Sequence, residues 1–105
     1  NIAMQMALTG EPISAEEAHR FGMVNNLVEA GEAFEGAVSL AEKINENAPL
    51  AVRSTRRSLL ESLTLSDHEG MKFAIEETAA LTATEDYKEG PLAFIEKRLP
   101  VWKGK

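Results

Sequence analysis

The sequence predicts an all-α chain of five or six short helices. Helix start and stop signals recur along the whole chain, apolar residues recur at a helical period, and almost no segment alternates like a strand. The 105 residues fit one domain, and 44% hydrophobic with 27% charged residues is the mixture of a globular chain. We therefore expect residues 1–105 to form a single helical region.

The first helical segment, residues 2–8, is apolar, and Gly10 follows it as a left-handed C-cap. A native protein rarely starts inside an apolar helix without a cap, so we expect this chain to be a piece of a longer one. The next helix should start at a capping box formed by Ser14 and Glu17. It is about two turns long and ends before Gly22.

The central part contains the only strand-like stretch, residues 23–28, which we expect to be extended with Val24 and Val28 buried. A helix is expected over residues 31–47, and its apolar stripe consists of Phe34, Ala37, Val38, Ala41 and Ile44. Pro49 suits the first position of the next helix, which should reach about Leu63.

The last part contains a second capping box at Ser66 and Glu69, followed by a clear apolar stripe made of Met71, Ala74, Ile75, Thr78 and Leu81. Phe73 stands off that stripe. Thr84 caps one more helix, which Gly90-Pro91 is expected to kink or restart and which carries Lys97 and Arg98 at its C-terminal end. Pro100 prevents continuation. Such short helices with broad apolar stripes need a partner surface.

Composition excludes several classes of function. The net charge is −6, which argues against a nucleic-acid binder or an anionic-membrane binder. The chain has no cysteine, so disulfides, thiolate zinc sites and cysteine nucleophiles are excluded. The longest stretch without charge has only ten residues, and a signal peptide pattern is missing, so we expect a cytoplasmic protein.

No catalytic constellation is evident. The adjacent carboxylates Glu16/Glu17 and Glu76/Glu77 point about 100° apart on a helix, which is typical of a solvated face rather than of an acid–base pair. The two histidines, His19 and His68, lie 49 positions apart and lack the spacing of a metal site. We therefore name no catalytic residue, no metal ligand and no cofactor for this chain.

Two basic features can be read in two ways. Arg53, Arg56 and Arg57 form either a solvated face with salt bridges or a phosphate contact. Phe94 and Lys97 are three positions apart on one helix face, so the ring could stack on a purine while the ammonium pairs with a phosphate. The simpler interpretation is a core phenylalanine and a helix-end lysine.

Three segments together resemble the enoyl-CoA hydratase/isomerase family of the crotonase superfamily. They are LTGEPISAEEA followed by FGMVN in residues 8–25, AEKI through NAPLAV in residues 41–52, and TEDYKEG with AFIEKR in residues 84–98. In the tail, Pro100 and Trp102-Lys103-Gly104 also match. The resemblance covers essentially the whole chain, although Pro91 departs from the usual pattern.

The resemblance implies the C-terminal helical portion of a crotonase-type fold. The oxyanion hole and the catalytic acids of the family lie in a preceding region, so this chain alone should be inactive. In the family this helical part forms oligomer contacts, giving a homo-oligomer that is a trimer or a dimer of trimers. Phe94 and Lys97 match positions that contact the coenzyme A of the acyl-CoA substrate, which is a substrate rather than a bound cofactor.

Two further hypotheses stay open. The chain could be a freestanding helical interaction module without catalysis. It could also be part of a crotonase-type isomerase, hydrolase or decarboxylase, since these motifs do not separate the members of the superfamily.

Overall fold

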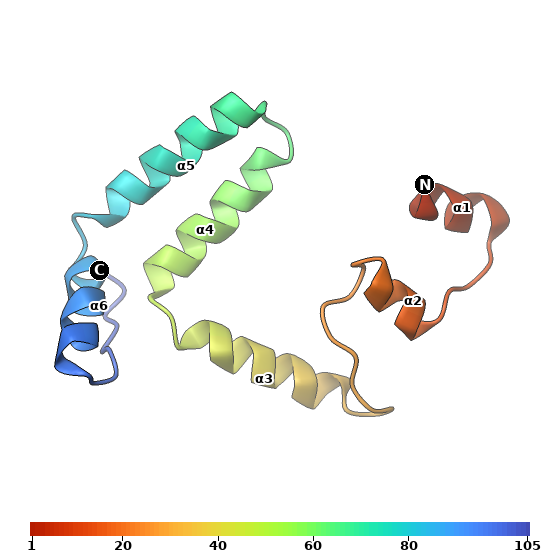
Figure 1. The fold of residues 1–105 in the computed structure, drawn as a ribbon, viewed down its shortest axis with the longest axis horizontal. Helices are drawn as coiled ribbons and strands as arrows, with labels where there is room; N and C mark the ends of the chain where they lie inside the picture. Colours follow the sequence, from red (N-terminus) through yellow and green to blue (C-terminus); the bar gives the residue numbers. More distant parts are fainter. The chain divides into compact units, whose positions relative to one another are not determined.

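The computed structural model describes residues 1–105 and contains six α-helices and no strand (Figure 1), which confirms the predicted fold class. The chain divides into two compact units, Asn1–Val38 and Ser39–Lys105, and each is described by itself. The helices are α1 (Ile2–Thr9), α2 (Ala15–Arg20), α3 (Ala33–Asn45), α4 (Pro49–Ser62), α5 (Asp67–Leu81) and α6 (Glu85–Glu96). No helix is long and apolar enough to span a membrane.

The helix starts follow the predicted capping chemistry. The Ser14 hydroxyl accepts the Glu17 N–H at 3.1 Å, and the Ser14 N–H donates to the Glu17 carboxylate at 3.1 Å. The same reciprocal arrangement joins Ser66 and Glu69 at the start of α5. Each box satisfies backbone donors that the first turn of a helix leaves unpaired. Gly10 adopts the expected left-handed conformation, with φ 67°.

The expectation that Val24 and Val28 are buried is wrong. They are 41% and 47% exposed, and residues 23–28 form no strand. A short extended segment gains little without a second strand to pair with, and its unit contains none. Val28 instead lies close to the backbone of α3, where a Cβ on Gly36 would come within 2.9 Å of its side chain.

The second unit is built on α4 and α5, which pack along each other as an antiparallel pair (Figure 1). The face of α5 that meets α4 is not the apolar stripe. Gly70 approaches Ser62, and the Arg57 guanidinium of α4 lies 5.2 Å from the centre of the Phe73 ring. Met71 and Ile75, from the stripe, are 64% and 62% exposed. The pairing therefore leaves part of the apolar stripe of α5, at Met71 and Ile75, uncovered.

The last helix differs from expectation at two places. Gly90-Pro91 does not restart α6, which runs without interruption from Glu85 to Glu96. Lys97 is not its last helical residue but its cap, with φ 53° and ψ 40°. The predicted position of Lys97 and Arg98 within the helix is therefore wrong, because the chain turns sharply at Lys97 and runs back.

After this turn the tail runs back beside α6 (Figure 1). The Trp102 indole N–H donates to the Glu46 carbonyl oxygen at 2.7 Å, and its ring lies 3.5 Å from where a Cβ on Gly90 would stand. Gly104 approaches the Pro49 ring. The tail thus joins α6 to the connection between α3 and α4.

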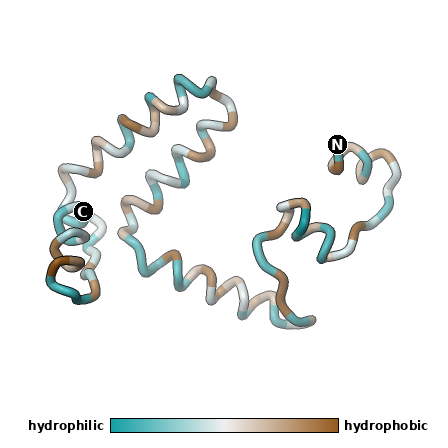
Figure 2. Tube along the Cα trace, in the orientation of Figure 1, coloured by the Kyte–Doolittle hydropathy of each residue, from teal (hydrophilic) through white to brown (hydrophobic).

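Very little of the chain is closed off from solvent. Ala93 and Asp86 are the only buried residues, at 2% and 4% exposure. Figure 2 shows apolar residues spaced among polar ones along α3, α4 and α5. In the second unit, the large apolar side chains of Leu63, Met71 and Ile75 are all more than 60% exposed. Apolar surface that a closed domain would bury remains open here.

Candidate binding site at the end of the last helix

Phe94 stands on the last turn of α6 with 85% of its surface exposed. Its neighbour Ala93 supplies the buried contact of this turn instead. The interpretation of Phe94 as a core residue therefore fails within this unit. An aromatic ring this exposed is available to stack on a planar ligand or to pack on another surface.

Lys97 closes α6 in a Schellman motif. Its N–H donates to the Phe94 carbonyl oxygen at 3.3 Å, and the Arg98 N–H donates to the Ala93 carbonyl oxygen at 3.1 Å. The residue between these bonds must be left-handed, a position that glycine normally occupies. Lys97 is the only non-glycine residue of the chain with positive φ. A lysine here costs about 1–2 kcal/mol of backbone strain, and such strain is common at functional positions.

The structure keeps Phe94 and Lys97 in one turn, but only Phe94 belongs to the helix. The Lys97 backbone is bonded to that of Phe94, yet Lys97 leaves the helical path. Its side chain is exposed and makes no ion pair or hydrogen bond. The Lys97 ammonium is therefore uncommitted, which means that it has no bonded partner. The charged groups of Arg98, Lys103 and Lys105 each bind a glutamate.

The neighbouring Arg98 is fully engaged. Its guanidinium forms a two-bond fork with the Glu89 carboxylate, one bond being 3.0 Å, and it also donates to Glu96 at 2.6 Å. The Val101 N–H adds a further bond to Glu89 at 2.7 Å. These bonds, that from Arg98 first, lower the pKa of Glu89 to about 2. The fork is the strong, directional form of this ion pair.

The first turn of α6 holds the end of the tail. The buried Asp86 carboxylate accepts the N–H groups of Lys103 and Gly104 at 2.7 and 2.9 Å. The Lys105 carbonyl oxygen accepts the Glu85 N–H at 2.7 Å. A hydrogen bond from the Lys103 ammonium lowers the pKa of Glu85. A buried carboxylate is stable only when its oxygens are satisfied in this way.

Sequence reasoning gives no binding role to Glu85, Asp86 or Glu89. The available signal was the pattern of three acids over the first turns of α6 and three cations in the tail, at positions 98, 103 and 105. Nothing in the spacing of the chain shows that the tail reverses direction.

The other candidate residues have structural roles. Glu17 serves the capping box, Glu77 binds Arg57 at 3.0 Å, and Glu76 lies 4.0 Å from Lys72. The His19 ring nitrogen lies 3.3 Å from the Val24 carbonyl oxygen. No group of three or more histidine or acidic side chains could hold a metal ion. All three arginines are exposed, and of them only Arg57 forms a salt bridge.

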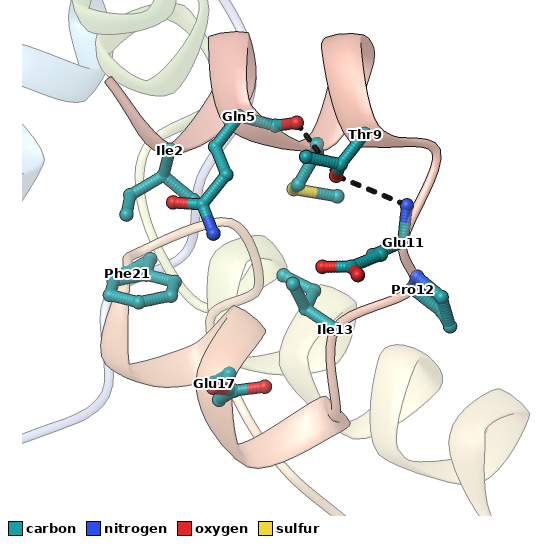
Figure 3. Close-up of a pocket in the computed structure, with 9 residues that line it drawn as sticks. Ile2, Gln5, Thr9, Glu11, Pro12, Ile13, Glu17 and Phe21 are labelled. Atoms are coloured by element: carbon teal, nitrogen blue, oxygen red, sulfur yellow. Dashed lines mark hydrogen bonds between the residues drawn. The ribbon is translucent and has the colours of Figure 1, made fainter.

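A hollow of about 180 Å³ lies between α1 and α2 in the first unit (Figure 3). Gln5 extends from α1 toward the space between Phe21 and Ile13. The Thr9 hydroxyl donates to the Gln5 carbonyl oxygen and accepts the Glu11 N–H, which shapes the turn beyond α1. These polar groups serve the local backbone, and no acid–base pair is assembled here.

The second unit thus presents an open helical surface whose last helix ends in an exposed ring and an uncommitted ammonium. Comparison with known proteins identifies the family to which this helical region belongs. The family model described as enoyl-CoA hydratase/isomerase matches residues 1–105. The chain belongs to the enoyl-CoA hydratase/isomerase family, as its motifs predicted.

Individual relatives show the same similarity. The chain is 42% identical over 103 residues to an (E)-benzylidenesuccinyl-CoA hydratase of Thauera aromatica, covering 98% of the chain and 40% of that protein. It is 37% identical over 108 residues to a carnitinyl-CoA dehydratase of Salmonella typhi, covering 99% and 41%. A crystal structure of enoyl-CoA hydratase from Mycobacterium tuberculosis H37Rv matches with a TM-score of 0.94 and 43% identity, covering 99% and 41%.

The chain therefore spans about two fifths of the length of these relatives and corresponds to their C-terminal part. The structure describes the helical portion of a crotonase-type fold, in agreement with the prediction.

Proposed function

We propose that this chain is the C-terminal part of an enzyme that acts on acyl-CoA thioesters, where it supplies coenzyme A contacts and oligomer contacts. The family and the printed names of the relatives, which are CoA hydratases and a CoA dehydratase, support the substrate class. The groups that stabilise an enolate oxyanion and move protons would come from the rest of that enzyme.

One observation carries the coenzyme A contact. Lys97 is held in a strained left-handed turn with an uncommitted ammonium, and the exposed Phe94 ring lies in the same turn. The adenosine part of coenzyme A offers a planar purine and phosphate groups. A stacked ring and a charge-assisted hydrogen bond are the matching interactions.

The uncovered apolar surface supports the oligomer contact. In the second unit, Leu59, Leu63, Met71 and Ile75 are all more than 60% exposed. Apolar patches of this kind mark surfaces that pack on other protein. We propose a homo-oligomer, a trimer or a dimer of trimers, with further copies of the whole enzyme as partners.

The test of the coenzyme A contact compares two substrates in the complete enzyme. Lys97→Ala should weaken the binding of crotonyl-CoA by about 1–2 kcal/mol, the size of a partly exposed charge-assisted bond. Crotonyl-pantetheine, which lacks the adenosine phosphates, should bind the variant and the unchanged enzyme equally well. If Lys97→Ala weakens both substrates equally, Lys97 does not contact that phosphate and the helix-end interpretation holds.

A further inference from the structure

Glu89 lies five positions before Phe94 and makes no hydrogen bond or ion pair with Phe94 or Lys97. Its carboxylate nevertheless binds two residues of the segment that follows Lys97. One oxygen accepts from the Arg98 guanidinium and from the Val101 N–H, and the other accepts from Arg98 at 3.0 Å. Arg98 directly follows Lys97, and Val101 lies three positions further along the chain.

The bonds to Glu89 hold Arg98, which also supplies the second hydrogen bond of the Schellman motif. Arg98 donates its own backbone N–H to the Ala93 carbonyl oxygen, directly after the left-handed Lys97. Because the left-handed conformation costs a non-glycine residue free energy, the turn needs neighbours that hold it. Arg98 is held at its backbone by α6 and at its side chain by Glu89.

We propose that Glu89 is a positioning residue for Lys97, fixing through Arg98 the strained turn from which the lysine reaches its ligand. This inference rests on the proposed coenzyme A contact of Lys97. Glu89 itself touches no ligand in this proposal. Its action is to narrow the set of turn conformations, so that less conformational freedom is lost when the ammonium meets a phosphate.

Glu85 provides a matched control on the same helix. It is an exposed glutamate that binds tail cations, lying 3.0 Å from Lys103 and 3.7 Å from Lys105, but it makes no contact with Arg98. Glu85→Gln therefore removes the same charge from the same helix and also loosens the tail. Only Glu89→Gln removes the fork on the residue after Lys97.

The experiment is a double-mutant cycle in the complete enzyme, with crotonyl-CoA and crotonyl-pantetheine as the probes. Glu89→Gln should weaken crotonyl-CoA binding about three- to tenfold, the size of coupling carried through adjacent packed residues. It should leave crotonyl-pantetheine binding unchanged, and Glu85→Gln should change neither. In the Lys97→Ala background, Glu89→Gln should add no further loss, because the lysine that it positions is missing.

The outcomes separate this inference from the function on which it rests. Suppose that Lys97→Ala weakens the binding of crotonyl-CoA but not that of crotonyl-pantetheine. If Glu89→Gln then has no effect on crotonyl-CoA binding, or if its loss adds fully to that of Lys97→Ala in the double variant, the positioning role is overturned and the lysine contact stands. If Lys97→Ala leaves the preference for crotonyl-CoA unchanged, both are overturned. Should Glu89→Gln fold poorly, Arg98→Lys serves instead, since lysine keeps the charge but cannot form the fork. Arg98→Lys should then reproduce the selective loss, and normal crotonyl-CoA binding by it would overturn the proposal.

Discussion

The Asp86 carboxylate accepts the backbone N–H of Gly104 at 2.9 Å, across 18 positions of the chain. The second oxygen of Asp86 accepts the Lys103 N–H, so one buried side chain holds two successive amides of the tail. A carboxylate on the first turn of a helix thus determines where the C-terminal residues lie. The positions of Trp102 and of the tail cations depend on this bond.

Asp86→Asn should release the tail. The amide has one acceptor oxygen where the carboxylate has two, and its NH₂ group would face a backbone donor. We expect the free energy of unfolding to fall by about 1–3 kcal/mol, the cost of leaving a buried donor unsatisfied. Trp102 is the only tryptophan of the chain, so its emission should shift to the red as the indole loses the Glu46 carbonyl.

Asp67→Asn is the control for this variant. Asp67 also stands in the first turn of a helix, α5, but it is exposed and contacts no part of the tail. Its replacement should leave the Trp102 emission unchanged. Equal emission shifts in both variants would contradict the role of Asp86.

Acid should detach the turn around Arg98 in a defined range of pH. The pKa of Glu89 is held at about 2 by Arg98 and the Val101 N–H, with a smaller contribution from Lys103, against 4.5 when the side chain is free. The lowered pKa means that Glu89 stabilises the fold fully above about pH 4.5 and that this contribution is lost as the pH falls toward 2.

A pH titration of Trp102 emission measures this effect, because the tail carries both Trp102 and Arg98. Glu85 titrates nearby with a lowered pKa as well, so the informative quantity is the difference between the unchanged chain and Glu89→Gln. The difference in Trp102 emission between the unchanged chain and Glu89→Gln should be constant above pH 5 and should shrink below it. Parallel curves down to pH 2 would show that Glu89 does not hold the tail.

Phe73 should matter more for stability than Ile75, although Ile75 belongs to the regular apolar stripe. Phe73 is half-buried against α4 under Arg57, whereas Ile75 is 62% exposed. Phe73→Ala should lower the free energy of unfolding by about 1–2 kcal/mol through lost apolar burial and the lost guanidinium contact. Ile75→Ala should stay within about 0.5 kcal/mol. Urea unfolding followed by circular dichroism compares them, and the reverse order would contradict the packing described here.

Lys97→Gly should stabilise the turn while Lys97→Ala should not. Glycine adopts the left-handed conformation without strain, so we expect a gain of about 1 kcal/mol, whereas alanine keeps the strain. Both variants remove the ammonium and should therefore lose the preference for crotonyl-CoA. Thermal unfolding of the two variants checks the first point, and an equal melting temperature would show that the turn is not strained at Lys97.

The chain should associate with itself in solution. The exposed apolar stripe of α5 gives a surface that a second molecule can cover. Light scattering over a concentration series should show mass rising with concentration. Ile75→Gln should weaken this association, while Glu76→Gln, which gives the same residue at the neighbouring position, should not. A monomer at every concentration would contradict the prediction.

Local features of this protein could be predicted from the sequence because they depend on neighbours in the chain. The capping boxes at Ser14 and Ser66 and the left-handed Gly10 follow from hydrogen bonds within four residues. The N-terminal place of Pro49 follows from its fixed φ and its missing N–H. The family motifs also lie in continuous segments, and the match over residues 1–105 confirms them.

Only the tertiary structure decided which faces meet and where the tail runs. Periodicity identifies the apolar stripe of α5 but not its partner, so it could not show that α4 packs on the Phe73 side. The path of the tail after α6 depends on Glu89 and Asp86, which bind residues 9 to 18 positions later. Contacts over such distances arise when the chain reverses, and no local propensity specifies them.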